Sequence, residues 1–366
     1  MTTEVSSTEA PKTPQIRISK KKQALFAFIL FTLFLLALEG LLRIIGVGAE
    51  DPSQKIGAGL YRVTNNSFGF EYTPGWEGIH AGARVHINSM GWRGRELSPT
   101  KPPATIRILG IGDSFTFGKA VNDEDVFLVK LEQMLNDDGA ANFEVLNAGR
   151  ESADTVQELE YFKNRELLKL EPDVVVLGFT VSNDAQGTNN RRLYRRARRD
   201  ATLALKISES AWFKALSEKS RIAKVLEHGA EWASSKELSR INTELIVSNF
   251  EDGSESWEHC RDALLGFYDI CHQKNVPLIL AIFPDYGSDL NQSFKDYPEE
   301  FRRIHVKLRA VLEGKSGAVV VDVTDDLAAA GLTARQIMVP VDGHPNRIWH
   351  EIVARRLHDT IKGLYR

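Results

Sequence analysis

Ile106-Arg107-Ile108-Leu109-Gly110-Ile111 runs directly into Gly112-Asp113-Ser114-Phe115-Thr116-Phe117-Gly118, and this stretch decides the fold class. Its first half is a nearly continuous apolar run, which is typical of a strand covered on both faces of a parallel sheet. Its second half is a glycine-rich turn that carries a serine. Since active sites in open α/β sheets lie at the carboxyl ends of the strands, Ser114 stands where a catalytic side chain is expected.

The chain downstream continues this alternation of strand and helix. The sequence Thr155-Val156-Gln157-Glu158 predicts that Thr155 and Glu158 form a capping box at the start of one helix. Alternating strands and helices predict a three-layer α/β/α domain with a parallel sheet of about five strands. The predicted strands are 106–111, 143–146, 174–177, 278–283 and 318–321, and the predicted helices are 126–135, 156–168, 257–273, 299–312 and 347–364.

Three other mechanisms that use a glycine-rich turn need residues that this turn lacks. A dinucleotide-binding turn needs a third glycine, where Phe115 stands. A phosphate-binding loop needs Ser or Thr where the chain has Ala120. A nucleophile elbow of the α/β-hydrolase type needs a glycine where Thr116 stands. The turn therefore fits none of these three mechanisms.

The same segment closely resembles the first sequence block of the SGNH/GDSL serine hydrolase superfamily, in which Gly-Asp-Ser is followed by an apolar residue or Thr, then Thr, any residue and Gly. The resemblance implies a flavodoxin-like α/β fold and a nucleophilic Ser114, whose own backbone N–H helps to bind an oxyanion. It covers residues 104–184 and 276–366. Gly75 and residues 87–94 resemble the extension found in bacterial members with an amino-terminal membrane helix.

Two further family elements follow the next two predicted strands. Gly149, in Asn147-Ala148-Gly149, matches the glycine whose backbone N–H donates to the oxyanion. Asn183, in Ser182-Asn183-Asp184, matches the asparagine whose side-chain amide donates as well. Val181 departs from the family pattern, which commonly has a glycine there. From the residue types alone, a turn glycine and a helix cap are the alternative roles of Gly149 and Asn183.

The fourth family element is Asp342-Gly343-His344-Pro345-Asn346 near the carboxyl end. The resemblance implies that His344 deprotonates Ser114 as general base and then protonates the leaving group. It implies that Asp342 holds the tautomer of the His344 ring and stabilises its charged form. Trp349 stands where the family commonly has a glycine, and His350 is interpreted as a structural histidine of the last helix. No metal or cofactor is implied.

An apolar stretch that reaches the length of a membrane-spanning helix follows three lysines near the amino end. The lysines predict that residues 1–22 are a cytoplasmic tail, that residues 23–46 are a single-pass anchor in the inner membrane, and that the rest is periplasmic. Glu39 and Arg43 can pair on one face of this helix because they are four residues apart. A cleavable signal peptide ending at 47–49 is the alternative.

Residues 47–103 are rich in Gly, Asn and aromatic residues, which predicts an irregular extension with short strands before a hydrolase domain at 104–366. Within this domain, the region of about 187–250 is charged and helix-prone, which predicts a helical insertion. A basic run in the insertion either attracts an anionic polymer or lipid head groups, or forms a solvated helix face that pairs with acidic residues. The run comprises Arg191, Arg192, Arg195, Arg196, Arg198, Arg199 and Lys206.

The 366-residue chain has a formal net charge of −3, so its composition gives no case for nucleic-acid binding. Its two cysteines, Cys260 and Cys271, fall in one predicted helix. Their separation along a helix is roughly 16 Å, whereas a disulfide needs Cα atoms within about 7 Å. The sequence therefore predicts two free thiols, and the spacing gives no cysteine zinc site.

Together these elements predict a membrane-anchored serine esterase that hydrolyses an acyl or O-acetyl ester through an acyl-enzyme. An O-acyltransferase that modifies a cell-surface polysaccharide would use the same Ser114, Asp342 and His344. A non-catalytic carbohydrate-binding or assembly protein would have no need of the acid–base pair. The expected partners are an ester substrate, carried by an acylated carbohydrate or a lipid, and the membrane.

Overall fold

The computed structural model describes residues 19–48, 55–65, 69–185, 196–197, 199–285, 290–339 and 342–365. The chain divides into two compact units. One comprises residues 1–49 and 207–230, and the other comprises residues 50–206 and 231–366. The larger unit holds the sheet and is described first.

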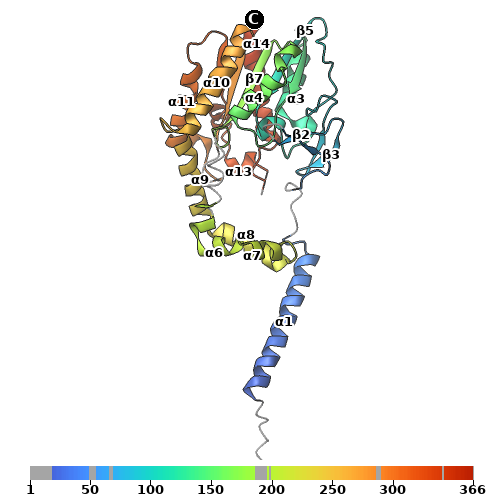
Figure 1. The fold of residues 1–366 in the computed structure, drawn as a ribbon, viewed down its shortest axis with the longest axis vertical. Coiled ribbons are helices and arrows are strands. Elements are labelled where there is room, and N and C mark those ends of the chain that lie inside the picture. Colours follow the sequence, from blue (N-terminus) through green and yellow to red (C-terminus); the bar gives the residue numbers. More distant parts are fainter. Residues whose placement is uncertain are drawn as a thin grey trace, which may run out of the picture. The chain divides into compact units, whose positions relative to one another are not determined.

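A five-stranded parallel sheet forms the centre of the larger unit (Figure 1). Its strand order is β6-β5-β7-β8-β9, which confirms the predicted sheet and is the flavodoxin-like order. Every residue of β7 and β8 is buried, which explains why these runs are apolar without alternation. The strands are β5 (Thr105–Ile111), β6 (Asn142–Asn147), β7 (Val174–Thr180), β8 (Leu278–Phe283) and β9 (Ala318–Asp322).

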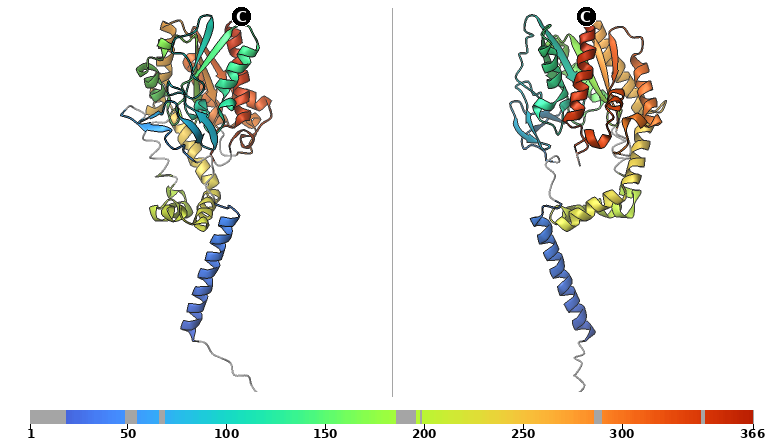
Figure 2. Two further views of the ribbon diagram at one scale, coloured as in Figure 1. Left: turned by 90° about the vertical axis from the view of Figure 1, so that its right-hand side faces the viewer. Right: turned by 180° about the vertical axis from the view of Figure 1, so that it is seen from behind.

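Helices cover both faces of the sheet. α3 (Phe127–Asp137) packs against α14 (Arg347–Leu364), while α10 (Glu255–Gln273) packs against α4 (Thr155–Asn164) and α11 (Glu299–Leu312). α10 and α11 lie in front of the sheet in Figure 1, and α14 lies in front in the right-hand view of Figure 2. This arrangement confirms the predicted three layers. The shorter elements are α2 (Ser114–Phe117), α12 (Thr324–Ala329), α13 (Ala334–Ile337) and the 3-10 turns η2 (Asp123–Asp125), η3 (Leu167–Leu170) and η4 (Phe294–Asp296).

The start of α4 differs from the prediction by one residue. Asp154 is the N-cap and forms a capping box with Gln157, through contacts of 3.0 and 3.2 Å. The predicted pairing of Thr155 with Glu158 is therefore wrong. Asp154 caps better than threonine in this position because a carboxylate accepts strongly from the first N–H groups of a helix. The cap leaves Glu158 in the interior, where it is buried.

The amino-terminal extension contains the short strands that its composition predicts. They form two antiparallel ribbons, β1 (Tyr61–Val63) with β2 (Phe70–Tyr72) and β3 (Glu77–His80) with β4 (Ala83–His86). The aromatic side chains of the first ribbon pack on one another and, through Tyr72 and Phe117, on the turn that follows β5. The extension is thus part of the structure that supports the carboxyl end of the sheet.

Arg93 joins the extension to the same turn. Its guanidinium is buried and donates to the carbonyl oxygens of Gly118 and Val121 at 2.5 and 2.6 Å. It also donates to Asp123 Oδ1 at 2.7 Å. A buried arginine with all of these acceptors is stabilising because its charge is both paired and hydrogen-bonded.

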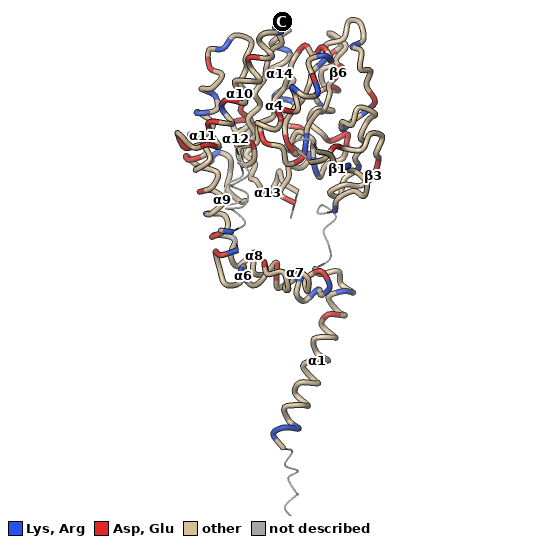
Figure 3. The backbone as a smooth tube through the Cα atoms, in the orientation of Figure 1, with Lys and Arg blue, Asp and Glu red and all other residues tan. Residues whose placement is uncertain are grey.

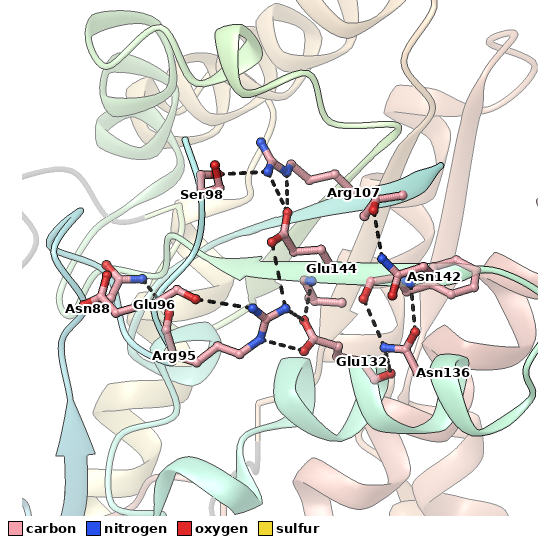
Figure 4. Close-up of polar contacts among 12 residues, drawn as sticks. Asn88, Arg95, Glu96, Ser98, Arg107, Glu132, Asn136, Asn142 and Glu144 are labelled. Atoms are coloured by element: carbon pink, nitrogen blue, oxygen red, sulfur yellow. Dashed lines mark hydrogen bonds and ion pairs between the residues drawn. The ribbon is translucent and has the colours of Figure 1, made fainter. Parts of the chain in front are cut away.

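A second buried arginine fixes the opposite end of strands β5 and β6 (Figure 4). Arg107 donates to Glu144 Oε2 at 2.7 Å and to the carbonyl oxygen of Ser98 at 3.0 Å. Arg95 pairs with Glu132 at 3.0 Å in the same network. The segment that leads from the extension into β5 is therefore held against the sheet by charged hydrogen bonds.

The smaller unit is built from α1 (Lys20–Ile44), α7 (Ala211–Ser217) and most of α8 (Arg221–Ala233). α1 has 25 residues and is apolar enough to cross a membrane. Its middle carries no Lys, Arg, Asp or Glu, as Figure 3 shows. None of its residues is buried, which argues against a helix of a soluble core. Glu39 and Arg43 pair at 2.7 Å, as predicted.

The described part of the predicted insertion is helical. It comprises α6 (Leu203–Ser208), α7, α8 and α9 (Ser235–Asn249), and residues 196–197 and 199–250 contain no strand. In the basic run, Arg199 pairs with Asp200 at 3.3 Å on the surface, as a solvated face would. The rest of that run lies outside the described residues except Arg196 and Lys206.

Candidate active site

Ser114 lies at the carboxyl end of β5 and is the first residue of α2. Asp113 caps this short helix by accepting from the Phe115 N–H at 2.8 Å. Gly112 is required by close packing, because a Cβ there would come within 2.2 Å of Thr116 Oγ1. The first N–H groups of a helix have no partner within the helix. The turn therefore presents both the hydroxyl and the N–H of Ser114 at the edge of the sheet.

The structure brings Ser114, His344 and Asp342 together. Ser114 Oγ lies 2.9 Å from His344 Nε2, across a separation of 230 positions in the sequence. His344 Nδ1 is hydrogen-bonded to Asp342 Oδ1. A proton on Nδ1 that faces the carboxylate leaves Nε2 as an acceptor for the serine hydroxyl. The side chain of Asp342 is 2% exposed and that of His344 is 18% exposed, so the ring reaches the surface while its partner does not.

Lys119 is a second partner of Asp342 that sequence reasoning missed. Its Nζ lies 3.3 Å from Asp342 Oδ2. Burial alone would raise the pKa of Asp342, but the hydrogen bond and charge of His344, together with the Lys119 ammonium, outweigh burial and hold this pKa below its ordinary value. Asp342 is therefore a carboxylate at neutral pH. The only signal in the sequence was the position of Lys119 directly after the Gly118 that closes the motif.

The loop that carries His344 is fixed by its neighbours. The His344 carbonyl oxygen accepts from the Val339 N–H at 2.8 Å. Asn346 caps α14 by accepting from the Ile348 N–H at 2.9 Å, and its own N–H donates to the carbonyl of Ile337 at 2.7 Å. The ring of Phe115 lies 5.7 Å from the His344 ring. These contacts place the imidazole over Ser114 without support from the substrate.

The Gly149 N–H is engaged within the protein. It donates to Asn147 Oδ1 at 3.0 Å, and its role as an oxyanion donor stays a prediction. A Cβ on Gly149 would lie 2.3 Å from the backbone nitrogen of Phe117. Gly149 therefore serves the close approach of the β6 turn to α2. Asn147 was missed as a positioning residue; its amide also donates to the carbonyl oxygen of Thr116 at 3.1 Å.

The side-chain amide of Asn183 is also engaged within the protein. Asn183 Nδ2 donates to the carbonyl of Ala153 at 2.6 Å and to Asp113 Oδ2 at 3.1 Å. These two bonds use both amide hydrogens. Asn183 is nevertheless in contact with the residue before the nucleophile, at the point between β5 and β7 where the strand order reverses. Its role as an oxyanion donor stays a prediction.

A cluster of buried carboxylates lies behind Asn183. Burial raises the pKa of Asp113 to about 6, against hydrogen bonds from the Phe115 N–H, Thr180 and Asn183 that lower it. Burial also raises the pKa values of Asp184 and Glu158, and the mutual repulsion of these acids adds to the effect. Neither carboxyl oxygen of Glu158 has a hydrogen-bond partner among the described residues. Glu158 is therefore expected to be protonated in the folded protein.

We expect Glu158→Gln to stabilise the protein increasingly as the pH rises. The unfolded chain releases the Glu158 proton near the ordinary pKa of 4.5, whereas the folded chain keeps it to a higher pH. The unfolded state then binds fewer protons, so stability falls with rising pH, and a glutamine removes this loss. The measurement is the melting temperature of both proteins from about pH 5 to about pH 8.

The exposed Glu160 on the same helix gives the matched control. Glu160→Gln should leave the pH dependence of the melting temperature unchanged. A difference between Glu158→Gln and the unaltered protein that stays constant across the pH range would contradict the assignment of a raised Glu158 pKa.

We expect Gly149→Ala to lower both stability and any activity of the site. The added Cβ would meet backbone atoms of Thr116 and Phe117, which cannot move aside as a flexible side chain can. The displacement would fall on α2 and hence on Ser114. Gly229→Ala is the control because a Cβ at Gly229, in α8, meets nothing within 4 Å. Thermal unfolding of both variants measures the effect, and equal melting temperatures would rule out the packing role of Gly149.

A cavity of about 420 Å³ lies in the same unit, lined by the extension and by residues that follow the turns of β5 and β6. Lys119 belongs both to its wall and to the ion pair with Asp342. Its wall is mixed, with aromatic, basic and acidic side chains: Lys55, Ile56, Tyr61, Phe70, His80, Ala81, Lys119, Glu151 and Ser152. Lys119 is thus the residue that links this cavity to Asp342.

Other reactive side chains of the larger unit have structural surroundings. His350 is fully buried and accepts from the Phe127 N–H at 3.2 Å. Burial and nearby positive charges lower its pKa to about 3, so it stays neutral. Cys260 and Cys271 are buried free thiols in α10, as predicted. Among the residues that the structure describes, no group of three His, Cys, Asp or Glu side chains could hold a metal ion.

No protein-family model and no curated protein matches the sequence. Solved structures that are similar to the chain include a GDSL-like lipase from Bacteroides thetaiotaomicron, at 13% identity over 70% of this chain and 88% of that one, with a TM-score of 0.38. The psychrotrophic esterase EstA from Pseudoalteromonas sp. is similar at 14% identity, over 71% and 98% of the two chains, with a TM-score of 0.37.

An acetyl xylan esterase is similar at 15% identity, over 70% of this chain and all of that one, with a TM-score of 0.37. The chain is thus similar, over about 70% of its length, to solved structures of GDSL-type lipases and esterases.

Proposed function

We propose that the protein is a serine esterase in which Ser114 attacks an ester carbonyl and forms an acyl-enzyme that water resolves. The observation that supports this most is the chain of hydrogen bonds from Ser114 Oγ to His344 Nε2 at 2.9 Å and from His344 Nδ1 to Asp342. A binding protein has no use for a serine hydroxyl that faces an acid–base pair.

In the first half-reaction, His344 Nε2 takes the proton of Ser114 as Oγ bonds to the carbonyl carbon. The same proton then goes to the departing alcohol oxygen, whose bond to the carbon breaks. In the second half-reaction, a water molecule loses its proton to His344 and attacks the acyl carbon. The Ser114 oxygen leaves and takes that proton back. The Asp342 carboxylate stabilises the imidazolium in both steps.

The developing oxyanion needs hydrogen-bond donors beside Ser114. Its own N–H, at the amino end of α2, is the donor that we assign to it, since a helix amino end favours negative charge. Asn183 becomes a second donor if its amide turns from the Ala153 carbonyl to the substrate. In that case the contact of Asn183 with Asp113 holds the side chain in place.

We propose further that α1 is an uncleaved anchor that holds the esterase in the periplasm. Lys20, Lys21 and Lys22 precede the apolar part of α1 and favour a cytoplasmic amino end. Glu39, near the other end, accepts hydrogen bonds from the Arg221 and Ile222 N–H groups at 3.0 and 3.1 Å. Signal-peptide cleavage after α1 would remove these bonds, so they support the anchor.

The activity test uses the full-length protein and acyl esters of short and long chain, with and without a sugar acceptor. We expect release of free carboxylic acid in both cases. Acylated sugar in place of free acid would identify an acyltransferase that uses the same residues. Absence of both products across the ester series, from protein shown to be folded, would contradict the proposal.

A further inference from the structure

Glu39 of α1 ties the insertion to the end of the apolar helix. Its two carboxyl oxygens accept from the Arg221 N–H, the Ile222 N–H and the Ser220 hydroxyl, at 3.0 to 3.1 Å. Arg43 of α1 donates to the carbonyl oxygen of Lys219. A carboxylate that accepts from the first N–H groups of a helix is a strong cap. The amino end of α8 is therefore held at the level where α1 ceases to be apolar.

The helices held at this level expose large apolar side chains. Trp212 of α7 is 64% exposed, and Leu216, one helical turn later, is 47% exposed. On α8, Leu226 is 59% exposed and Trp232 is 81% exposed. Val225 and Trp232 are seven residues apart and share a helix face. Folding leaves this much tryptophan and leucine surface in water only at a cost of roughly 25 cal/mol per Å².

The space between these helices and α1 is an apolar groove of about 380 Å³. Its walls are Leu35 and Leu36 of α1, and Phe213, Leu216 and Leu226 of the insertion. The charged lining residues lie at the end of α1 where Glu39 meets α8. Apart from this charged end, a groove that opens on the apolar side chains of a membrane-spanning helix offers room for an acyl chain and few groups with which water can hydrogen-bond.

We propose that α7 and α8 lie in the lipid–water interface of the membrane that α1 crosses, with Trp212 and Trp232 at the boundary between head groups and acyl chains. Amphipathic interfacial helices and the tryptophans of membrane proteins occupy this depth. The inference rests on the proposed membrane anchor. The occupant of the exposed apolar face and of the groove is bilayer lipid.

The test is tryptophan quenching by lipid that carries bromine on its acyl chains. The full-length protein is placed in phosphatidylcholine vesicles with and without brominated phosphatidylcholine. α1 contains no tryptophan, and Trp92, Trp257 and Trp349 are buried in the larger unit. We expect brominated lipid to quench the unaltered protein and the W212F/W232F double variant to lose most of that quenching. Trp76→Phe is the matched control and should retain the quenching.

The anchor is measured separately, as sedimentation of the protein with the vesicles after an alkaline wash. Protein that sediments but shows equal quenching with and without Trp212 and Trp232 would overturn the interfacial placement while the anchor stands. Quenching that appears only when the protein is diluted in lipid would show that a second copy covers this face, which also overturns it. Protein that fails to sediment would refute the anchor and the inference with it.

Discussion

Ser114→Ala is expected to reduce ester hydrolysis by at least about 10⁴-fold while the fold persists. In the proposed mechanism, the variant loses the oxygen that attacks the ester carbonyl and forms the acyl-enzyme. Ser114 Oγ contacts His344 Nε2 and its side chain is partly exposed, so alanine leaves neither a large cavity nor a buried charge. Steady-state kinetics measures the loss, and circular dichroism with the melting temperature measures the fold.

Ser248→Ala is the matched control, since Ser248 is exposed on α9 and its hydroxyl donates to the carbonyl oxygen of Leu245 in the same helix. It should hydrolyse esters at the unaltered rate. If Ser114→Ala kept near-normal turnover with an unchanged circular dichroism spectrum, another residue would be the nucleophile.

Asp342→Asn is expected to lower kcat by about 10⁴-fold with little change in melting temperature. An asparagine amide does not stabilise an imidazolium, and it can favour the tautomer that puts the proton on Nε2. That tautomer cannot accept the proton of Ser114. The carboxylate is buried and hydrogen-bonded to His344, so water cannot replace it.

Lys119→Met tests whether Asp342 acts by orienting the His344 imidazole or through its ion pair with Lys119. It removes the ammonium that lies 3.3 Å from Asp342 Oδ2 and leaves the bond to His344 in place. Because a partly exposed ion pair is worth about 1 kcal/mol or less, kcat should fall by about tenfold or less. Equal losses in Lys119→Met and Asp342→Asn would mean that Asp342 acts through the ion pair and not through the imidazole.

The fold followed from local patterns in the sequence. Each of the five strands was predicted because a parallel strand that is buried on both faces must be apolar along its whole length, as β7 and β8 are. The contact between Ser114 and His344 was also within reach. The strand-end rule indicated the position of Ser114, whereas the role of His344, which lies between α13 and α14, came from the resemblance of its motif to the family pattern.

The directions of single hydrogen bonds could not be predicted in the same way. Gly149 and Asn183 fit family positions, but where their N–H groups point depends on acceptors nearby. Asn147 lies two residues before Gly149, and Asp113 lies 70 residues before Asn183. Spacing along the sequence does not show which of several acceptors is nearest in space.

Glu39 shows the same limit at long range. Its pairing with Arg43 followed from the helical repeat, whereas its cap on α8 joins residues about 180 positions apart. Glu158 shows the same limit for residues close in the sequence. Asp154, a better cap residue, forms the capping box in place of Thr155, and the Glu158 side chain is buried. In both cases, a hydrogen bond that the local sequence pattern does not indicate decided where the glutamate side chain lies.

The most direct measurement of the central claim is covalent labelling by a fluorophosphonate, which reacts with a serine only when a base has activated its hydroxyl. Mass spectrometry of the digested full-length protein should find one phosphonylated peptide, with the label on Ser114. Ser114→Ala should take up no label, and Asp342→Asn should label far more slowly than the unaltered protein. A folded protein that takes up no label, or that carries the label on another serine, would contradict the assignment of Ser114 and His344 as nucleophile and base.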